Sequence, residues 1–319
     1  MEYISVPYVK NKVTKIVFGT AIPVFLDGTD QNKLLDAAYE MGITTIDTAR
    51  VYGDAEKSLG KWIYEKNMRD KIVLLSKCGH HDLVTGEKRV NEKEMRWDFE
   101  ISSNYLKTDY IDIYVLHRDD PDMAAGEIIE IFNAMHAEGK IGAFGGSNWI
   151  HQRIEEANEY AYKHNLIPFT VSSPNFGLAE MVADPWGGGC VSISGSQNAE
   201  VREWYKKNHI SVFAYASLAH GLLSGRVKSV EPEKASSIMD EAGMKGFFCE
   251  ANIERLRRCE ELATKKGCTV PQLAMAWSLK QDLNVCALVG TSNIERLKQN
   301  VAALDIVLTK EELAWMNLE

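Results

Sequence analysis

Cysteine is scarce in this chain, and long apolar runs are missing from it. The six cysteines among 319 residues are scattered and form no CxxC pair, which indicates the reduced thiols of a cytosolic protein. No stretch approaches the ~18 consecutive apolar residues that a membrane helix needs. Residues 1–5 (MEYIS) lack the basic-then-apolar layout of a secretion signal. We therefore expect a cytoplasmic protein with no membrane partner.

An excess of positive charge is also missing. The net charge is −9, which argues against a nucleic acid or an anionic membrane surface as partner. Hydrophobic residues make up 45% and charged residues 25% of the chain, as in ordinary globular proteins. A chain of this length suits one large α/β barrel or two average domains.

Internal repeats and a G-x-G-x-x-G motif are absent, whereas strand and helix patterns alternate regularly. Eight strands that alternate with helices predict an α/β fold, a closed (β/α)8 TIM barrel with residues 1–319 in a single domain. An open doubly wound sheet is the competing fold, and the missing glycine motif disfavours its dinucleotide-binding form. The expected strands cover residues 13–18, 44–46, 72–76, 111–116, 141–146, 169–172, 211–215 and 285–289.

The alternation is interrupted by an irregular insertion at residues 174–195. It contains the sequence PWGGG, which predicts neither a helix nor a strand. A loop of this length is usually functional or disordered. We interpret it as a lid or as the wall of a pocket.

Polar side chains stand at the ends of three successive expected strands. Asp47 and Tyr52 follow the second strand, Lys77 the third and His117 the fourth. Because all strand C-termini of a parallel barrel share one face, we expect these four side chains to converge. The Lys77 ammonium would favour the phenolate and so make Tyr52 a better proton donor.

This set of residues suits the reversible reduction of a carbonyl. Tyr52 would give a proton to the oxygen, and His117 would donate a hydrogen bond to the developing oxyanion. No side chain can supply a hydride, so the chemistry requires a nicotinamide cofactor. Each residue taken alone also has a structural explanation: a helix cap for Asp47, rim packing for Tyr52, an ion pair for Lys77 and a local hydrogen bond for His117.

Six separate segments of the chain resemble the aldo-keto reductases, in the right order and over almost the whole length. The resemblance implies a (β/α)8 barrel that binds NADP(H), with Asp47, Tyr52, Lys77 and His117 as the catalytic tetrad. It makes Tyr52 the general acid/base, which Lys77 and Asp47 tune while His117 orients the carbonyl. The segments are GITTIDTARVYGDAEKSLGKWI, LLSKCG, TDYIDIYVLHRDDP, GKIGAFGGSNW, YASLAHGLLSGR and LVGTSNIERLKQNV.

The same resemblance implies contacts to the nicotinamide. Ser147 and Asn148 would bond the carboxamide, and Tyr215 would stack on the ring. Ser172 takes the place where many members have a glutamine that completes the carboxamide contact. From the residues alone, Ser147 and Asn148 could instead cap the next helix, and Tyr215 could be a core residue.

The remaining cofactor contacts follow from the resemblance too. Ser292 and Arg296 favour NADP(H) over NAD(H), because they match the site of the 2′-phosphate at the start of the last barrel helix. A surface ion pair of Arg296 with a neighbouring glutamate is the alternative, and Arg226 could be a solvated surface residue. The further expected contacts are Gly19, Thr20 and Asp47 at the first two strand ends, Ala216, Ser217, Leu218, Ala219, Gly221 and Arg226 around the pyrophosphate, Gly290, Thr291, Ser292 and Arg296 at the 2′-phosphate, and Gln299 and Asn300 near the adenine.

The substrate is less constrained by the sequence than the cofactor. His80, Arg118 and Trp149 are expected near the reacting carbonyl, and polar groups beside an aromatic ring suit a sugar or keto-sugar. His80 and His81 have no third ligand at a fixed spacing, so no metal is predicted. Two other functions remain open: an NADP(H)-binding regulatory subunit with little turnover, and a lyase with Lys77 as a Schiff-base nucleophile.

Overall fold

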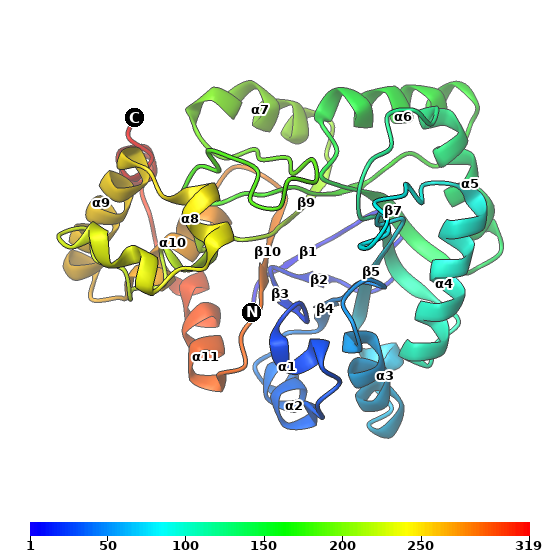
Figure 1. Ribbon diagram of the computed structural model, residues 1–319, viewed down its shortest axis with the longest axis horizontal. Coiled ribbons are helices and arrows are strands. Elements are labelled where there is room, and N and C mark those ends of the chain that lie inside the picture. Colours follow the sequence, from blue (N-terminus) through cyan, green and yellow to red (C-terminus); the bar gives the residue numbers. More distant parts are fainter.

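Eight parallel strands close into a barrel in the computed structural model, which describes residues 1–319 (Figure 1). The strands follow one another around the ring in chain order, and the last pairs with the first. This ring confirms the predicted (β/α)8 TIM barrel and excludes the open doubly wound sheet. The strands are β3 (Ile16–Gly19), β4 (Thr45–Asp47), β5 (Val73–Cys78), β6 (Ile111–Leu116), β7 (Ile141–Ser147), β8 (Val171–Ser173), β9 (Ser211–Ala214) and β10 (Val285–Val289).

Helices surround the strands (Figure 1). The sequence patterns do not predict α1 or α8, because both are too short to show a helical period. None of the helices is long and apolar enough to cross a membrane. The helices are α1 (Pro23–Leu26), α2 (Asn32–Glu40), α3 (Ala55–Glu65), α4 (Glu92–Leu106), α5 (Ala125–Ala137), α6 (His151–Lys163), α7 (Ala199–Lys207), α8 (Glu241–Phe247), α9 (Glu250–Lys266), α10 (Val270–Leu279), α11 (Ile294–Ala302) and α12 (Lys310–Met316).

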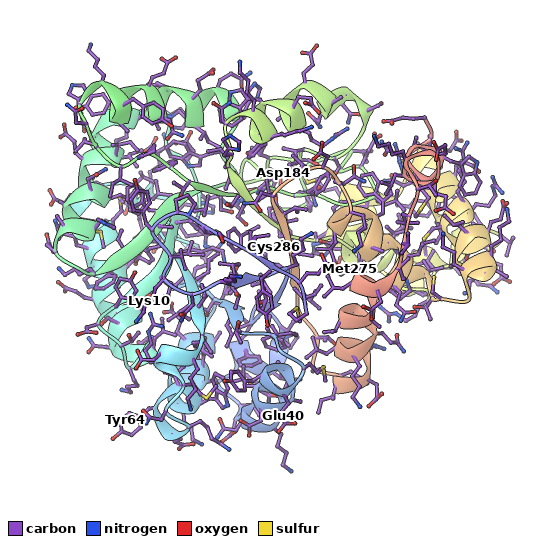
Figure 2. The ribbon with its side chains drawn as sticks, turned by 180° about the vertical axis from the view of Figure 1, so that it is seen from behind. Lys10, Glu40, Tyr64, Asp184, Met275 and Cys286 are labelled. Atoms are coloured by element: carbon purple, nitrogen blue, oxygen red, sulfur yellow. The ribbon has the colours of Figure 1, made fainter.

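The strands are buried on both faces, which explains their nearly continuous apolar sequences. In β5, Val73 and Leu75 point into the barrel, whereas Leu74 packs against the helices outside it. This period of two is the geometry of an extended strand. Figure 2 shows Cys286 of β10 near the centre of the molecule and Tyr64 of α3 at its edge.

A short hairpin closes the N-terminal end of the barrel. β1 (Tyr3–Ile4) pairs antiparallel with β2 (Val13–Thr14), and Ile4 and Val6 join the apolar cluster inside the ring. The sequence predicts one strand over residues 13–18, but the structure divides it into β2 and β3. Because this end is sealed, a ligand can enter the barrel mouth only at the C-terminal ends of the strands.

Local signals in the sequence fix several helix ends. α10 begins with a capping box, in which Thr269 and Gln272 each bond the backbone N–H of the other. α9 ends at Gly267, whose φ of 67° is the left-handed conformation that glycine adopts at little cost. Between these signals the chain turns, so that α9 packs against α10, and α10 packs against β10.

Candidate active site

Four polar side chains converge at the C-terminal face of the barrel. Asp47 is the last residue of β4, Lys77 lies near the end of β5, and His117 directly follows β6. Tyr52 lies on the loop between β4 and α3, and its ring meets the edge of the His117 ring at a centroid distance of 5.5 Å. Three strand ends and one loop therefore bring the four residues together.

Lys77 lies at the centre of this group. Its Nζ donates to Asp47 Oδ1 at 2.5 Å, to the Thr48 carbonyl oxygen at 2.8 Å and to the Tyr52 hydroxyl oxygen at 3.3 Å. Burial opposes its charge, but the attraction of Asp47 and Tyr52 is stronger and raises the pKa of Lys77. A lysine held as an ammonium is a poor nucleophile, which weighs against the Schiff-base lyase.

The Tyr52 phenol keeps its proton in this environment. Burial disfavours the phenolate more than the nearby Lys77 ammonium favours it, so the pKa of Tyr52 is raised. Lys77 lowers the pKa of Tyr52 as expected, but burial outweighs this effect. The donated hydrogen bond from Lys77 leaves the Tyr52 O–H free to point into the cavity.

His117 is an uncharged donor or acceptor at the same place. Burial lowers its pKa well below the usual range, and the charges of Lys77 and Arg118 lower it further. Its backbone N–H bonds the Cys78 carbonyl oxygen at 2.7 Å, while its Nδ1 has no hydrogen-bond partner. The imidazole is therefore neutral near pH 7 and is not satisfied by a local bond.

A cavity of about 660 Å³ begins at these four residues and extends across the barrel mouth to α11. Its volume lies within the range of small-molecule and cofactor sites. All four side chains described above line it. The other expected cofactor or substrate residues in its wall are Gly19, His80, Arg118, Ser147, Asn148, Tyr215, Ala216, Ser217, Leu218, Gly221, Gly290, Thr291, Arg296, Gln299 and Asn300.

Five expected cofactor residues lie outside the wall of this cavity: Ser172, which is described below, and four others. Thr20 and Ala219 are buried, so their side chains are not available to a ligand in the cavity. Arg226 and Ser292 are exposed beside it, and the Arg226 Nε bonds the Ser224 hydroxyl at 3.4 Å. These four residues could take part only through backbone groups or after a change of side-chain rotamer.

Ser172 does not face the cavity, so its predicted contact with the cofactor is wrong. Its hydroxyl shares a 2.9 Å hydrogen bond with the Tyr205 hydroxyl on the outside of the barrel. The next residue, Ser173, lines the cavity and donates to the Phe213 carbonyl oxygen at 2.8 Å. Side chains alternate along a strand, so a sequence alignment wrong by one residue reverses the face.

Trp149 is the second correction. Its indole is fully buried between β7 and α6, 5.2 Å from the Phe169 ring, and does not line the cavity. A Cβ added at Gly146 would lie 2.6 Å from the indole, so the glycine leaves room for it. Trp149 therefore packs behind the sheet and cannot contact a substrate.

A chain of hydrogen bonds joins four polar residues in the cavity wall. Ser147 Oγ donates to the Ser173 carbonyl oxygen at 3.0 Å, Asn148 Nδ2 donates to Ser147 Oγ at 3.2 Å, and the Tyr215 hydroxyl donates to Asn148 Oδ1 at 2.6 Å. The N-cap of α6 is Ile150, so Ser147 and Asn148 do not cap that helix. Both residues are held facing the cavity, which fits the binding of a carboxamide.

The far half of the cavity fits phosphate groups. The Ser217 hydroxyl is buried there without a hydrogen-bond partner, and Ala216, Ala219 and His220 have left-handed backbone conformations in the same loop. Arg296 lies at the start of α11 and forms no ion pair, since Glu295 pairs with Lys298 instead. The surface ion pair considered for Arg296 is therefore absent.

The 174–195 insertion contributes residues that sequence reasoning missed. It contains neither helix nor strand, and Trp186 reaches from it into the cavity wall, 5.1 Å from the His220 ring. Asp184 fixes the turn by accepting from the backbone N–H groups of Trp186, Gly187, Gly189 and Cys190 at 2.8–3.0 Å. Aspartate followed by glycines is a turn signal that could have indicated this ordered loop.

His80 and His81 lie beside His117. The His80 ring is 4.2 Å from the His81 ring and 4.8 Å from the His117 ring. Burial lowers the pKa of His80, and the charges of Arg118 and Arg89 add to this effect. The chain contains no group of three or more His, Cys, Asp or Glu side chains placed to hold a metal ion.

Comparison with known proteins agrees with this arrangement. The model of the aldo/keto reductase family matches residues 15–317. The chain is also 27% identical over 300 residues to L-glyceraldehyde 3-phosphate reductase of Escherichia coli O157:H7, a match that covers 90% of this chain and 82% of that relative. The chain therefore belongs to the aldo/keto reductase family and is an oxidoreductase of carbonyls and alcohols.

Proposed function

We propose that the protein is an NADP(H)-dependent oxidoreductase that interconverts an aldehyde, ketone or sugar-like carbonyl and its alcohol, with Tyr52 as general acid/base. The observation that carries the proposal is the contact of Lys77 with both Asp47 and Tyr52 in the wall of an elongated cavity. The cytoplasmic location rests on the scattered cysteines and stays a prediction.

Proton transfer is the part of the reaction that this chain performs. A carbonyl oxygen held between Tyr52 and His117 accepts the Tyr52 proton, and the Lys77 ammonium stabilises the phenolate that remains. A bound nicotinamide supplies the hydride in reduction and accepts it in oxidation. In the reverse direction the Tyr52 phenolate takes the proton of the alcohol.

Binding of the cofactor falls to the remaining residues of the cavity. Ser147 and Asn148 would hold the carboxamide, and the half-buried Tyr215 ring would lie against the nicotinamide. The 216–221 loop would receive the pyrophosphate. Arg296, which has no carboxylate partner, would bind the 2′-phosphate and so favour NADP(H) over NAD(H).

The test of the acid is Tyr52→Phe. We expect carbonyl reduction to fall by about 10²–10⁴-fold, the usual contribution of a general acid, with the Kd for NADPH unchanged. Tyr64→Phe, at an exposed position, is the control. Equal turnover by Tyr52→Phe and the natural protein would disprove the assignment.

The same assay separates an enzyme from a regulatory subunit. A panel of carbonyls is incubated with NADPH and the natural protein, and oxidation of NADPH is followed. L-Glyceraldehyde 3-phosphate belongs in the panel because the relative is named for its reduction. Tight NADPH binding without turnover of any carbonyl would favour the regulatory subunit.

Arg296→Ala tests the cofactor preference. We expect the Kd for NADPH to rise about 10- to 100-fold through loss of a charge-assisted hydrogen bond, and the Kd for NADH to change little. Arg257→Ala, at an exposed position on α9, is the control. An equal loss of affinity for both cofactors would contradict the proposed 2′-phosphate site.

A further inference from the structure

Arg118 is a half-buried arginine without a carboxylate partner. It follows His117 in the chain and lines the cavity near Tyr52 and His80. Its Nε is buried without a hydrogen-bond partner, and its Nη1 has only the Cys190 sulfur, at 3.7 Å. Removing a guanidinium from water without pairing it costs free energy, so an unpaired arginine here requires an explanation.

Most other partly or fully buried arginines in this protein have carboxylate partners. Of the two that have none, Arg202 donates to backbone carbonyl oxygens and Arg50 lies over aromatic rings, whereas Arg118 has neither kind of partner. Arg118 has no carboxylate partner although Asp184 lies on the neighbouring loop. The Asp184 carboxylate accepts four backbone N–H groups and forms no ion pair with Arg118. The paired arginines are Arg69 with Asp112, Arg89 with Asp98, Arg153 with Asp119 and Arg255 with Glu180.

The cavity around Arg118 offers no compensating negative charge. Asp47 is the one acidic residue in its wall, and it is already paired with Lys77. Arg118 directly follows His117 and lines the same cavity as Tyr52, in the part where the reacting carbonyl would lie. A positive charge therefore stands free beside the catalytic group.

The guanidinium lies against the 174–195 insertion, and its Nη1 contacts the Cys190 sulfur of that segment at 3.7 Å. A Cβ added at Gly188 would lie 3.6 Å from Arg118 Nε and 3.6 Å from its Nη2, so the loop backbone passes directly beside it. Asp184 fixes that loop through its backbone bonds. A guanidinium already fixed in position loses little conformational entropy when it binds an anion.

We propose that Arg118 binds an anionic group, a carboxylate or a phosphate, that the carbonyl substrate carries. The substrate class is then small anionic aldehydes or ketones, whose anionic group lies on Arg118 while the carbonyl lies at Tyr52. This proposal rests on the proposed function, because the same cavity must hold the reacting carbonyl. Guanidinium groups bind carboxylates and phosphates through two parallel N–H donors, which suits both anions.

The first experiment compares matched pairs of substrates by kcat/KM with NADPH. The pairs are 4-oxobutanoate with butanal, and glyceraldehyde 3-phosphate with glyceraldehyde. We expect the natural protein to prefer the anionic member of at least one pair by about 10- to 100-fold, chiefly through KM. The pair that shows the preference identifies the anion as a carboxylate or a phosphate.

Variants of Arg118 then test whether this residue causes the preference. In Arg118→Gln the anionic-to-neutral ratio should fall to near one, and Arg118→Lys should keep part of it. Arg257→Gln, an exposed arginine far from the cavity, should keep the full ratio. The ratio is the correct readout because a change in Tyr52 acidity affects both members of a pair equally. No preference in the natural protein, or the same preference in Arg118→Gln, would overturn the proposal.

Binding without turnover separates this proposal from the proposed function. Calorimetry measures the binding of glycerol 3-phosphate, succinate and glycerol to the natural protein and to Arg118→Gln. Saturable binding of an anion to the natural protein, absent in Arg118→Gln, supports the anion site. If no carbonyl is reduced in that case, only the proposed function fails. If carbonyls are reduced but neither anion binds and the ratio is one, only the anion site fails.

Discussion

Burial governs the protonation of Tyr52 and His117, the two groups proposed to bind the carbonyl oxygen. It raises the pKa of Tyr52 and lowers that of His117, so the phenol keeps its proton and the imidazole stays neutral near pH 7. Lys77 and Arg118 limit the rise at Tyr52, since both favour the phenolate. The Tyr52 phenol is thus held in its protonated form. Lys77 and Arg118 already stabilise the phenolate charge that appears when the proton leaves.

The pH dependence of the two directions should therefore differ. Carbonyl reduction needs protonated Tyr52 and should keep a constant kcat/KM from about pH 6 to pH 9, below a phenol pKa that exceeds its usual ~10. Alcohol oxidation needs the phenolate and should rise about tenfold per pH unit over that range. Steady-state rates in both directions test this, and a reduction rate that titrates near pH 6.5 would implicate a charged His117 instead.

The pairing of Lys77 with Asp47 should dominate the stability of the site. Both side chains are only 3% exposed, so Lys77→Met leaves a buried carboxylate without its partner. We expect the free energy of unfolding to fall by about 3–5 kcal/mol. Urea denaturation of Lys77→Met, Asp47→Asn and the double variant checks this. The double variant should lose less than the sum of the single losses, and strict additivity would contradict the pairing.

At the scale of elements, a buried carboxyl joins α3, β5 and α4. Glu56 of α3 accepts hydrogen bonds from Ser76 Oγ at 2.6 Å and from Ser102 Oγ at 2.9 Å. Burial raises its pKa from 4.5 to about 7 despite those bonds. The helices also approach closely here, since a Cβ at Gly60 would lie 1.9 Å from the Tyr105 carbonyl oxygen.

This raised pKa destabilises the fold as pH rises. The unfolded chain releases the Glu56 proton near pH 4.5 and the folded protein near pH 7, so stability falls between these values. The loss is about 3 kcal/mol above pH 7, since one pKa unit corresponds to about 1.4 kcal/mol. Glu56→Gln should therefore be more stable than the natural protein at pH 8 and similar to it at pH 4.5. Urea unfolding at both pH values checks this, with the exposed Glu100→Gln of α4 as control; equal effects at both pH values would contradict it.

At the scale of the whole molecule, stability and chemistry occupy opposite ends of the barrel. The β1–β2 hairpin seals the N-terminal end, and the proposed catalytic side chains lie at the C-terminal ends of the strands. The 174–195 insertion at the C-terminal face contributes Trp186 to the cavity wall. A change at the sealed end should therefore affect folding and leave the reaction unchanged.

Ile4→Ala tests this separation. Removing the buried side chain should lower the free energy of unfolding by about 2–5 kcal/mol through lost burial and the cavity left behind. The Kd for NADPH and kcat/KM at 25 °C should stay the same. Tyr3→Ala, whose side chain is 48% exposed, is the neighbouring control and should cost less. A large loss of activity in folded Ile4→Ala would show that the two ends are coupled.

The barrel and its four catalytic candidates could be predicted from the sequence, because the signals are local. Apolar runs bounded by turns mark the strands, and a polar residue at a strand end needs only the barrel topology to be placed. β1, α1 and α8 were not predicted, because two to seven residues are too few to show a period. The single strand predicted over residues 13–18 did not show the break between β2 and β3.

The sequence by itself thus determined the order of strands and helices and the meeting of Asp47, Tyr52, Lys77 and His117 at one face. The tertiary structure decided which neighbouring serine faces the cavity, that Trp149 packs behind the sheet, and that Arg118 has no carboxylate partner. The physical reason is that a side chain's direction changes with a single step along a strand. Its burial and pairing, moreover, are set by segments far away in the chain.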